Sequence, residues 1–206
     1  MDTVKAVIDV GTNSIKFHAA RKKADGSLET VLDKNDIARL GEGLRETGLI
    51  SPEALERNAL SVAAFAEKAK ELGAVPEIVG TMALRTAKNA ADFASRVKEL
   101  TGLDVRIIPG EEEARLSYLA VLSGLPLAGG ELVTFDTGGG STEFVYGRGT
   151  EMVRKFSVPL GAVRITEEFF ADDPVRPGSV DAAVKEIRSS LTGGGVLGSP
   201  EVIVGM

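Results

Sequence analysis

The feature that most constrains the fold is a glycine-rich turn at residues 135–143, set between two short apolar runs. Mostly apolar residues at 132–135 lead into Asp136, three glycines and two hydroxyl residues, and a second apolar run follows at 144–146. This pattern predicts a strand, a tight turn and a second strand. Because glycines lack a Cβ and reach positive φ, their backbone N–H groups can line up around an anion. Taken alone, the stretch is equally compatible with a phosphate-binding turn and with an ordinary glycine-rich hairpin.

Asp136, at the end of its strand, would face the same spot as the glycine amides. A carboxylate repels a phosphate unless a divalent cation or its water shell lies between them. Mg²⁺ suits such a position, because it keeps waters and binds through one or two carboxylates together with phosphate oxygens. The stretch therefore suggests metal-assisted phosphate binding.

A second copy of this pattern lies at the N-terminus. An apolar run ends in Asp9, and Gly11, Thr12, Asn13 and Ser14 follow before another strand pattern at 15–20. Two such turns in one chain favour phosphate binding over two unrelated loops. If each turn lies at the edge of its own domain, the two would hold a phosphate chain from both sides of a cleft. The pair resembles the two phosphate loops of the actin-like ATPase superfamily.

Composition limits the classes of protein to which the chain can belong. Its 206 residues have room for one large or two small domains. With 24 basic and 30 acidic residues, the net charge of −6 has the wrong sign for coating nucleic acid or a membrane. The absence of cysteine excludes disulfides and thiolate metal sites and fits a cytoplasmic protein. We therefore expect a cytoplasmic enzyme with neither nucleic acid nor membrane as a partner.

Strands and helices alternate along the rest of the chain, which predicts parallel strands with helices packed on the sheet. In the first half we expect strands at 28–32, 78–81 and 104–108, a helix that starts at Ser51, and a helix at 90–100 capped by Asn89. The second half predicts strands at 132–135, 143–146, 152–158 and 202–205. It also predicts a helix at 180–191, followed by a loop that contains glycines 193–195, Ser199 and Pro200.

Two charged segments allow more than one interpretation. The glutamates at 111–113 open a helix, where the dipole stabilises acidic residues, but one of them could also take a proton from a water attacking a phosphate. The pattern alone does not select which. Arg39, before the glycine-containing segment 40–44, could reach an anion, or the segment could simply connect to the next helix.

Six short motifs, in order over essentially the whole chain, closely resemble the exopolyphosphatase/guanosine pentaphosphate phosphohydrolase family; they lie at residues 8–14, 40–44, 81–85, 110–116, 136–143 and 159–164. The resemblance implies an α/β, actin-like (ribonuclease H-like) fold of two domains, with mixed sheets and flanking helices. We place the domains at residues 1–125 and 126–206. The implied activity is hydrolysis, with Mg²⁺ or another divalent cation, of terminal phosphate from inorganic polyphosphate or of the 5′-phosphate of guanosine pentaphosphate.

The resemblance also implies roles for single residues. Glu113 matches the general base that activates the attacking water, and Arg85 matches an arginine that contacts phosphate. Asp136 and Glu143 match the acids that hold Mg²⁺ or its waters, and Asp9 is a further candidate. The phosphates would lie against two backbone segments, made of Gly11, Thr12, Asn13 and Ser14 and of Gly138, Gly139, Gly140 and Ser141.

The family's second domain continues beyond the pattern that ends here at residue 206, so we expect a truncated chain with an incomplete second domain. Uncovered apolar surface and an open sheet edge would favour a homodimer or strand exchange. Two other functions are open: an ATP-dependent kinase or ATPase of the same superfamily, and a non-catalytic sensor of alarmone nucleotides. The preference between polyphosphate and guanosine pentaphosphate is also open.

Overall fold

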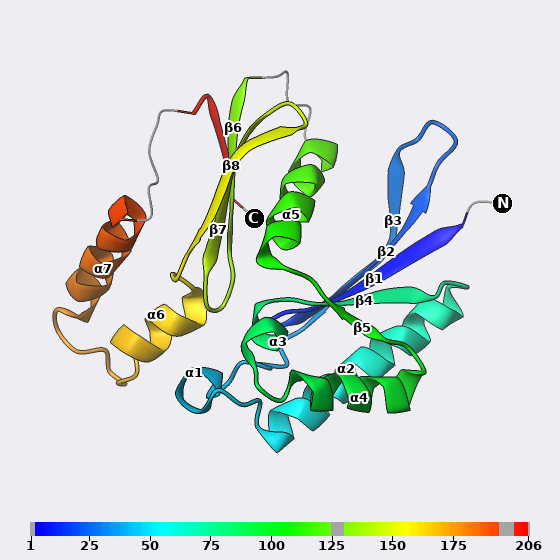
Figure 1. The fold of residues 1–206 in the computed structure, drawn as a ribbon, viewed down its shortest axis with the longest axis horizontal. Helices are drawn as coiled ribbons and strands as arrows, with labels where there is room; N and C mark the ends of the chain where they lie inside the picture. Colours follow the sequence, from blue (N-terminus) through cyan, green and yellow to red (C-terminus); the bar gives the residue numbers. More distant parts are fainter. Residues whose placement is uncertain (1–2, 125–129, 194–199, 206) are drawn as a thin grey trace. The chain divides into compact units, whose positions relative to one another are not determined.

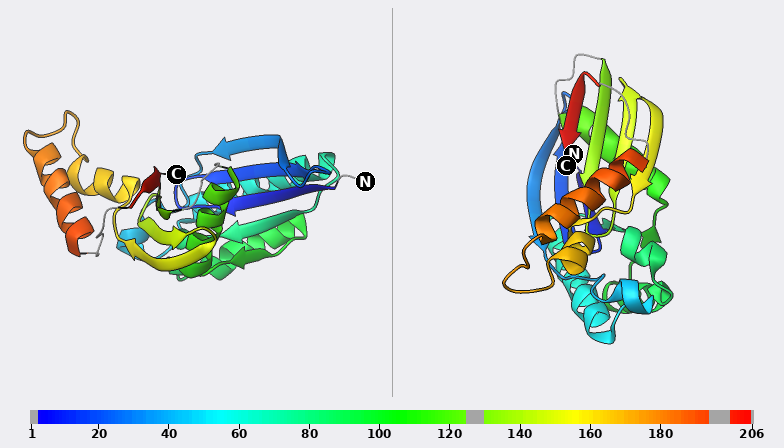
Figure 2. Two further views of the ribbon diagram at one scale, coloured as in Figure 1. Left: turned by 90° about the horizontal axis from the view of Figure 1, so that it is seen from above. Right: turned by 90° about the vertical axis from the view of Figure 1, so that its left-hand side faces the viewer.

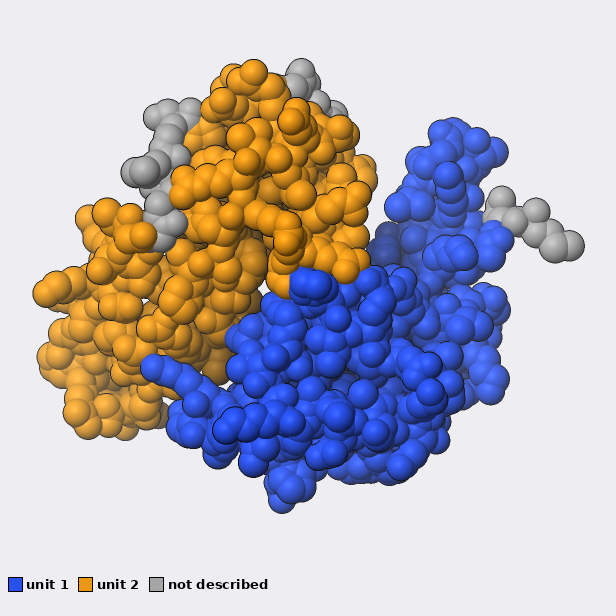
Figure 3. Space-filling view, viewed as in Figure 1, with its two compact units in different colours: residues 1–109 blue, residues 110–206 orange. Residues whose placement is uncertain are grey.

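The computed structural model describes residues 3–124, 130–193 and 200–205, and the chain divides into two compact units, residues 1–109 and 110–206 (Figures 1 and 3). The boundary lies earlier than the one expected after residue 125, which itself is outside the described residues. The physical reason is helix α5 (Gly110–Gly124), which packs on strands of the second unit. The proposed catalytic residue Glu113 therefore belongs to the second unit.

The first unit is built on a mixed five-stranded sheet in the order β3-β2-β1-β4-β5. Its strands are β1 (Val4–Val10), β2 (Ile15–Lys22), β3 (Leu28–Asp36), β4 (Pro76–Gly80) and β5 (Val105–Ile107). Strands β1 to β3 form an antiparallel meander, β4 pairs parallel to β1, and β5 pairs parallel to β4. The strands expected on both sides of the first glycine turn and the expected parallel strands are all present.

Four helices complete this unit: α1 (Leu44–Thr47), α2 (Pro52–Glu71), α3 (Met82–Thr86) and α4 (Ala90–Thr101). Helix α2 starts as expected, because the Ser51 hydroxyl accepts a hydrogen bond from the Ala54 N–H at 3.1 Å and Pro52 occupies the first helical position. Helix α4 also starts directly after Asn89 as expected, but the Asn89 side chain forms no capping hydrogen bond. The Asn89 amide instead bonds both the N–H and the C=O of Ile50, each at 2.9 Å.

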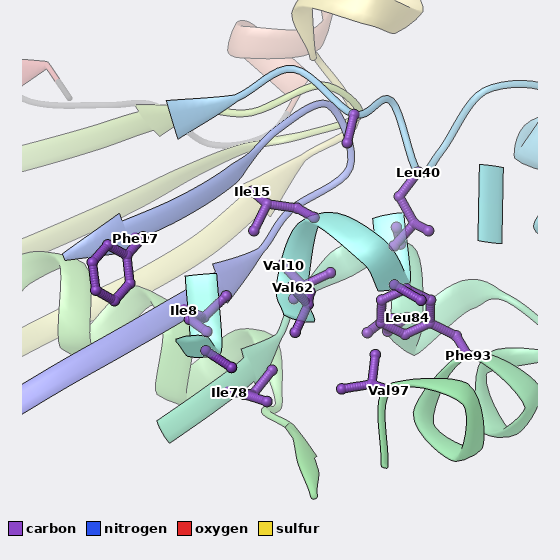
Figure 4. Packing of buried hydrophobic residues seen from close by; sticks show 14 of the residues in the cluster. Ile8, Val10, Ile15, Phe17, Leu40, Val62, Ile78, Leu84, Phe93 and Val97 are labelled. Atoms are coloured by element: carbon purple, nitrogen blue, oxygen red, sulfur yellow. The ribbon is translucent and has the colours of Figure 1, made fainter. Parts of the chain in front are cut away.

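Helices α2 and α4 pack together on one face of the five-stranded sheet (Figure 2). Alternate residues of β1 point into this core, so Ile8 and Val10 are fully buried while Asp9 lies on the opposite face. Side chains from strands, from helices and from the segment before α1 meet in this core; those labelled in Figure 4 are Ile8, Val10, Ile15, Phe17, Leu40, Val62, Ile78, Leu84, Phe93 and Val97.

The second unit contains a four-stranded sheet in the order β8-β7-β6-β9. Its strands are β6 (Glu131–Thr137), β7 (Thr142–Arg148), β8 (Glu151–Val158) and β9 (Val202–Gly205), and its helices are α5, α6 (Ala162–Phe169) and α7 (Ser179–Gly193). Helix α5 packs on one face of the sheet through Ala114, Tyr118 and Val121. Residues of α6 and α7 pack on apolar side chains of the other face.

Both units share one strand arrangement, a three-stranded meander with a parallel strand added beside its first strand. In the first unit β4 joins β1 with Val7 opposite Glu77, and in the second β9 joins β6 with Val133 opposite Ile203. Each glycine turn connects the first two strands of its meander. In the predicted loop after α7, Gly193 ends the helix and Pro200 is described, whereas residues 194, 195 and 199 lie outside the described part. No helix within the described ranges is long and apolar enough to cross a bilayer.

Candidate active site

The second glycine turn closes between β6 and β7 with its backbone bonded on both sides. The Gly138 N–H donates to the Ser141 carbonyl at 2.9 Å. The carbonyls of Gly138 and Gly139 accept hydrogen bonds from the N–H groups of Ala162 and Arg164, in the first turn of α6, at 2.9 and 3.1 Å. Helix α6 therefore holds the turn by two peptide planes.

This attachment also orients the turn amides. A peptide unit is planar and trans, so the N–H that follows a carbonyl points in the opposite direction. With the carbonyls of Gly138 and Gly139 directed at α6, the N–H groups of Gly139 and Gly140 point away from that helix. These two groups donate no backbone hydrogen bond within the described residues, which leaves them available to an anion.

Gly161, just before α6, is the residue that permits this close approach. A Cβ built on Gly161 would lie 2.3 Å from three backbone atoms of the turn, the C and O of Gly139 and the N of Gly140. No side chain fits at that distance, so the start of α6 and the turn are in direct backbone contact. The sequence placed Gly161 in a recognised motif but assigned it no role.

The first glycine turn has the same closure with a different support. The Gly11 N–H donates to the Ser14 carbonyl at 3.0 Å. The carbonyls of Thr12 and Asn13 accept from the N–H groups of Gly41 and Arg39, at 2.8 and 2.9 Å. Here an irregular segment, rather than a helix, orients the turn.

Arg39 therefore contributes through its backbone. Its φ of 50° is the one positive φ of a non-glycine residue among the described residues. The carbonyl of the preceding Ala38 accepts from Arg57 Nε and Asn58 Nδ2, each at 2.8 Å. These contacts from α2 anchor the segment that supports the first turn.

Two predicted metal ligands of the second unit lie directly opposite each other across the hairpin. Asp136 of β6 is the register partner of Glu143 of β7. Directly opposed residues in an antiparallel pair have Cβ atoms about 4.5–5.5 Å apart, and like charges there are destabilising. In the first unit the corresponding partners have opposite charges, since Asp9 faces Lys16. The second unit thus has an opposed carboxylate pair, whose mutual repulsion a bound cation would relieve.

The Glu143 carboxylate is held by two serine hydroxyls. Its Oε1 accepts from Ser141 Oγ at 2.6 Å and from Ser157 Oγ at 2.9 Å. Ser157 lies on β8 and is the register partner of Glu143, so Asp136, Glu143 and Ser157 form one row across three strands. The sequence did not single out Ser157, although its place in the predicted strand 152–158 puts it on a definite face.

The first turn of α5 lies near this row, on the same face of the sheet. Lys155, the next residue of β8 on that face after Ser157, forms an ion pair with Glu111. At the other end of the helix, Tyr118 Oη donates to the Gly149 carbonyl, beyond the far end of β7, at 2.8 Å. The helix therefore runs with its N-terminus toward the glycine turn, and the half-buried Glu113 lies in its first turn.

Arg85 belongs to the first unit, in the short helix α3. Its Nη1 donates to the Ile108 carbonyl at 3.0 Å, and the Ile108 N–H donates to the Gly80 carbonyl at 3.0 Å. Arg85 thereby holds in place the segment that directly follows β5. The predicted site residues are thus divided, with Arg85, Asp9 and residues 11–14 in the first unit and the others in the second.

The paired carboxylates fit a hard cation of the Mg²⁺ type. Within the described ranges, no three Asp, Glu, His or Cys side chains converge as a metal cluster. Two carboxylates match an ion that binds through one or two protein carboxylates and completes its octahedron with water and phosphate oxygens. Asp136 and Glu143 are the residues that would hold it, whereas Asp9 lies in the other unit.

The chain is similar to known proteins both in sequence and in fold. The sequence model of the Ppx/GppA phosphatase family matches residues 20–194. A Ppx/GppA family member from Aquifex aeolicus is 34% identical with a TM-score of 0.80, covering 100% of this chain and 66% of its own. An exopolyphosphatase-like protein is 31% identical with a TM-score of 0.87, covering 99% and 66%. An exopolyphosphatase from Cytophaga hutchinsonii is 26% identical with a TM-score of 0.82, covering 98% and 66%.

The chain thus spans 66% of the length of these solved structures. Its two mixed sheets with flanking helices confirm the expected actin-like α/β fold. On the family match and on identities above 30% over the whole chain, this protein belongs to the Ppx/GppA phosphatase family.

Proposed function

We propose that the protein is a Mg²⁺-dependent phosphoanhydride hydrolase that releases terminal phosphate from inorganic polyphosphate or the 5′-phosphate from guanosine pentaphosphate. The observation that carries the proposal is the opposed pair Asp136 and Glu143, beside turn amides that point away from α6. One carboxylate pair and one row of amides supply what a phosphate–metal complex needs. The phosphatase family and its exopolyphosphatase members support the same reaction class.

In this proposal each group of the second unit has one task. The backbone N–H groups of the turn bind phosphate oxygens, and Asp136 and Glu143 hold the cation or its waters. When bound, Mg²⁺ would neutralise negative charge on the phosphate oxygens. Glu113, in the first turn of α5, accepts the proton of the attacking water. Phosphoryl transfer depends mainly on such positioning and charge neutralisation.

The first unit contributes two further proposed contacts. The planar, always-charged guanidinium of Arg85 donates hydrogen bonds to phosphate, and its forked arrangement of N–H groups suits this task. The amides of Asn13 and Ser14 form a second anion-binding segment, since the carbonyls of Thr12 and Asn13 that precede them are bonded on the opposite side. An overall charge of −6 is compatible with a polyanionic substrate because these groups make the anion site locally.

The experiment is phosphate release from polyphosphate, guanosine pentaphosphate and ATP, each with Mg²⁺ and with EDTA. Glu113→Gln should lower turnover roughly 10²- to 10⁴-fold, the usual contribution of a general base, while substrate binding persists. Glu112→Gln is the matched control, because it makes the same charge change one residue away and should retain turnover. Equal loss in both variants, or none in Glu113→Gln, would contradict the role of Glu113.

The results with the three substrates also distinguish the proposed hydrolase from the alternative functions. Release from ATP alone would favour a kinase-like or ATPase activity. Binding of guanosine pentaphosphate without release would favour a sensor. A homodimer stays a prediction, supported by the 62% exposure of Ile203 on β9 and by an apolar hollow of about 520 Å³ between the second sheet and helices α6 and α7. Sedimentation equilibrium of the purified chain measures the oligomeric state.

A further inference from the structure

The hydrogen bonds to Glu143 use one of its two carboxylate oxygens. Ser141 Oγ and Ser157 Oγ both donate to Oε1, at 2.6 and 2.9 Å. A carboxylate oxygen has two lone-pair directions, so two hydroxyl donors occupy both of them on Oε1. Oε2 receives neither of these bonds. A cation that approaches this carboxylate therefore meets one available oxygen.

We infer that Ser157, with Ser141, restricts Glu143 to one-oxygen coordination and thereby makes Ser157 a residue that selects Mg²⁺ over Ca²⁺. This inference rests on the proposed Mg²⁺-dependent function. Mg²⁺ requires a near-ideal octahedron at about 2.0–2.1 Å and takes one oxygen from each carboxylate, whereas Ca²⁺ takes about 6–8 oxygens and readily binds a carboxylate through both. Blocking Oε1 therefore weakens the binding of Ca²⁺, the larger ion.

Ser157 can be altered without touching the glycine turn. It lies on β8, its side chain is exposed, and it contacts Glu143 across the strand pair. Removing its hydroxyl leaves no buried polar group without a partner, so the fold tolerates alanine. Ser141, by contrast, is part of the turn, and its removal would also change the proposed phosphate contacts. Ser157 therefore isolates the effect on the metal ligand.

Thr134 offers a matched control on the same face of the same sheet. It lies on β6 two residues before Asp136, and its Oγ1 is buried with no hydrogen-bond partner within the described residues. Thr134→Val removes a hydroxyl close to the carboxylate pair without removing a hydrogen bond. Any change it causes reports on packing rather than on the orientation of Glu143.

The test is direct ion binding. Protein-bound Mn²⁺ is followed by electron paramagnetic resonance, and Mg²⁺ and Ca²⁺ are each titrated to displace it from wild type, Ser157→Ala, Ser157→Thr and Thr134→Val. Ser157→Ala should lower the ratio of Mg²⁺ to Ca²⁺ affinity about tenfold, in the range usual for groups that orient a metal ligand. Ser157→Thr keeps the hydroxyl and should keep the wild-type ratio, as should Thr134→Val.

One outcome would overturn the inference. If the ratio of Mg²⁺ to Ca²⁺ affinity in Ser157→Ala equals that of wild type, whether the two affinities are unchanged or fall by the same factor, Ser157 does not select between the ions. The proposed function is judged separately, by wild type. If wild type binds no Mn²⁺, the metal-dependent function and the inference both fail. If wild type binds Mn²⁺ and releases phosphate with Mg²⁺, but Ser157→Ala keeps the wild-type ratio of Mg²⁺ to Ca²⁺ affinity, only the inference fails.

Discussion

Replacing Gly161 by alanine would disturb the second turn through a single methyl group. The added Cβ would lie 2.3 Å from three backbone atoms of residues 139 and 140, whereas ordinary contact begins at 3.4 Å. The start of α6 and the turn would have to separate by roughly 1 Å, in an interior packed as densely as an organic crystal. Because the obstructing atoms are backbone, rotation of a side chain cannot relieve the contact.

The cost follows from this geometry. Overpacking of this kind destabilises by about 1–3 kcal/mol, and a clash with backbone belongs at the upper end. At roughly 2–4 °C per kcal/mol for a chain of this length, about 3 kcal/mol corresponds to a Tm lower by about 6–12 °C. Displacing the turn amides by about 1 Å should also lower phosphate release on the order of 100-fold.

Differential scanning calorimetry and the phosphate-release assay measure the two effects. Gly193→Ala is the control, because a Cβ at that last residue of α7 meets no atom of the described residues within 4 Å and alanine favours helix. The control should keep or raise the Tm. If Gly161→Ala has the Tm and turnover of wild type, the direct backbone contact between α6 and the turn does not exist in solution, and the account of how the amides are oriented is refuted.

Two further predictions concern the dependence of stability on pH. Burial raises the pKa of Tyr118 above its ordinary value of 10.0. The contribution of the neutral Tyr118 to the free energy of unfolding is therefore fully present below pH 10 and falls as the pH rises above it. When Tm is measured against pH, Tyr118→Phe should reduce the fall in Tm above pH 10. The same variant loses the bond to the Gly149 carbonyl, which should cost about 1 kcal/mol at pH 7. Hydrogen bonds from Arg96, at 2.7 and 2.8 Å, lower the pKa of Glu56 below 4.5. The contribution of the ionised Glu56 to stability is therefore present above pH 4.5 and is lost as the pH falls below it. Glu56→Gln should reduce the fall in Tm at acidic pH, and an unchanged slope of Tm against pH would show that the Glu56–Arg96 pair has no effect in solution.

Local signals in the sequence predicted much of the fold. The alternation around both glycine turns predicted two hairpins, and the Ser51–Pro52 pair predicted the start of α2. Each signal depends on residues that are neighbours in sequence. Helix α3, with only Met82–Thr86, was missed because five residues are too few to establish a helical period.

Features that depend on distant residues could not be read in the same way. The bond between Ser157 and Glu143 requires the register of β7 against β8, and the contact of Gly161 with residue 139 requires the position of α6. The unit to which α5 belongs depends on which sheet its apolar side chains cover. The Asn89 amide bonds a backbone 39 residues earlier in place of its own helix. Tertiary contacts, rather than local propensity, decide all four.

The shared strand arrangement of the two units has a consequence for the order in which they fold. The hairpin pairs that close the turns, Val10 with Ile15 and Thr137 with Thr142, join residues five positions apart. By contrast, β4 and β9 join their partners across 70 residues, as in Val7 with Glu77 and Val133 with Ile203. Closing a longer loop costs more entropy, and hairpins form within about 1–10 μs. We therefore expect the backbone of the two glycine turns to be among the first parts of each unit to form, with the parallel strands completing the sheets around it.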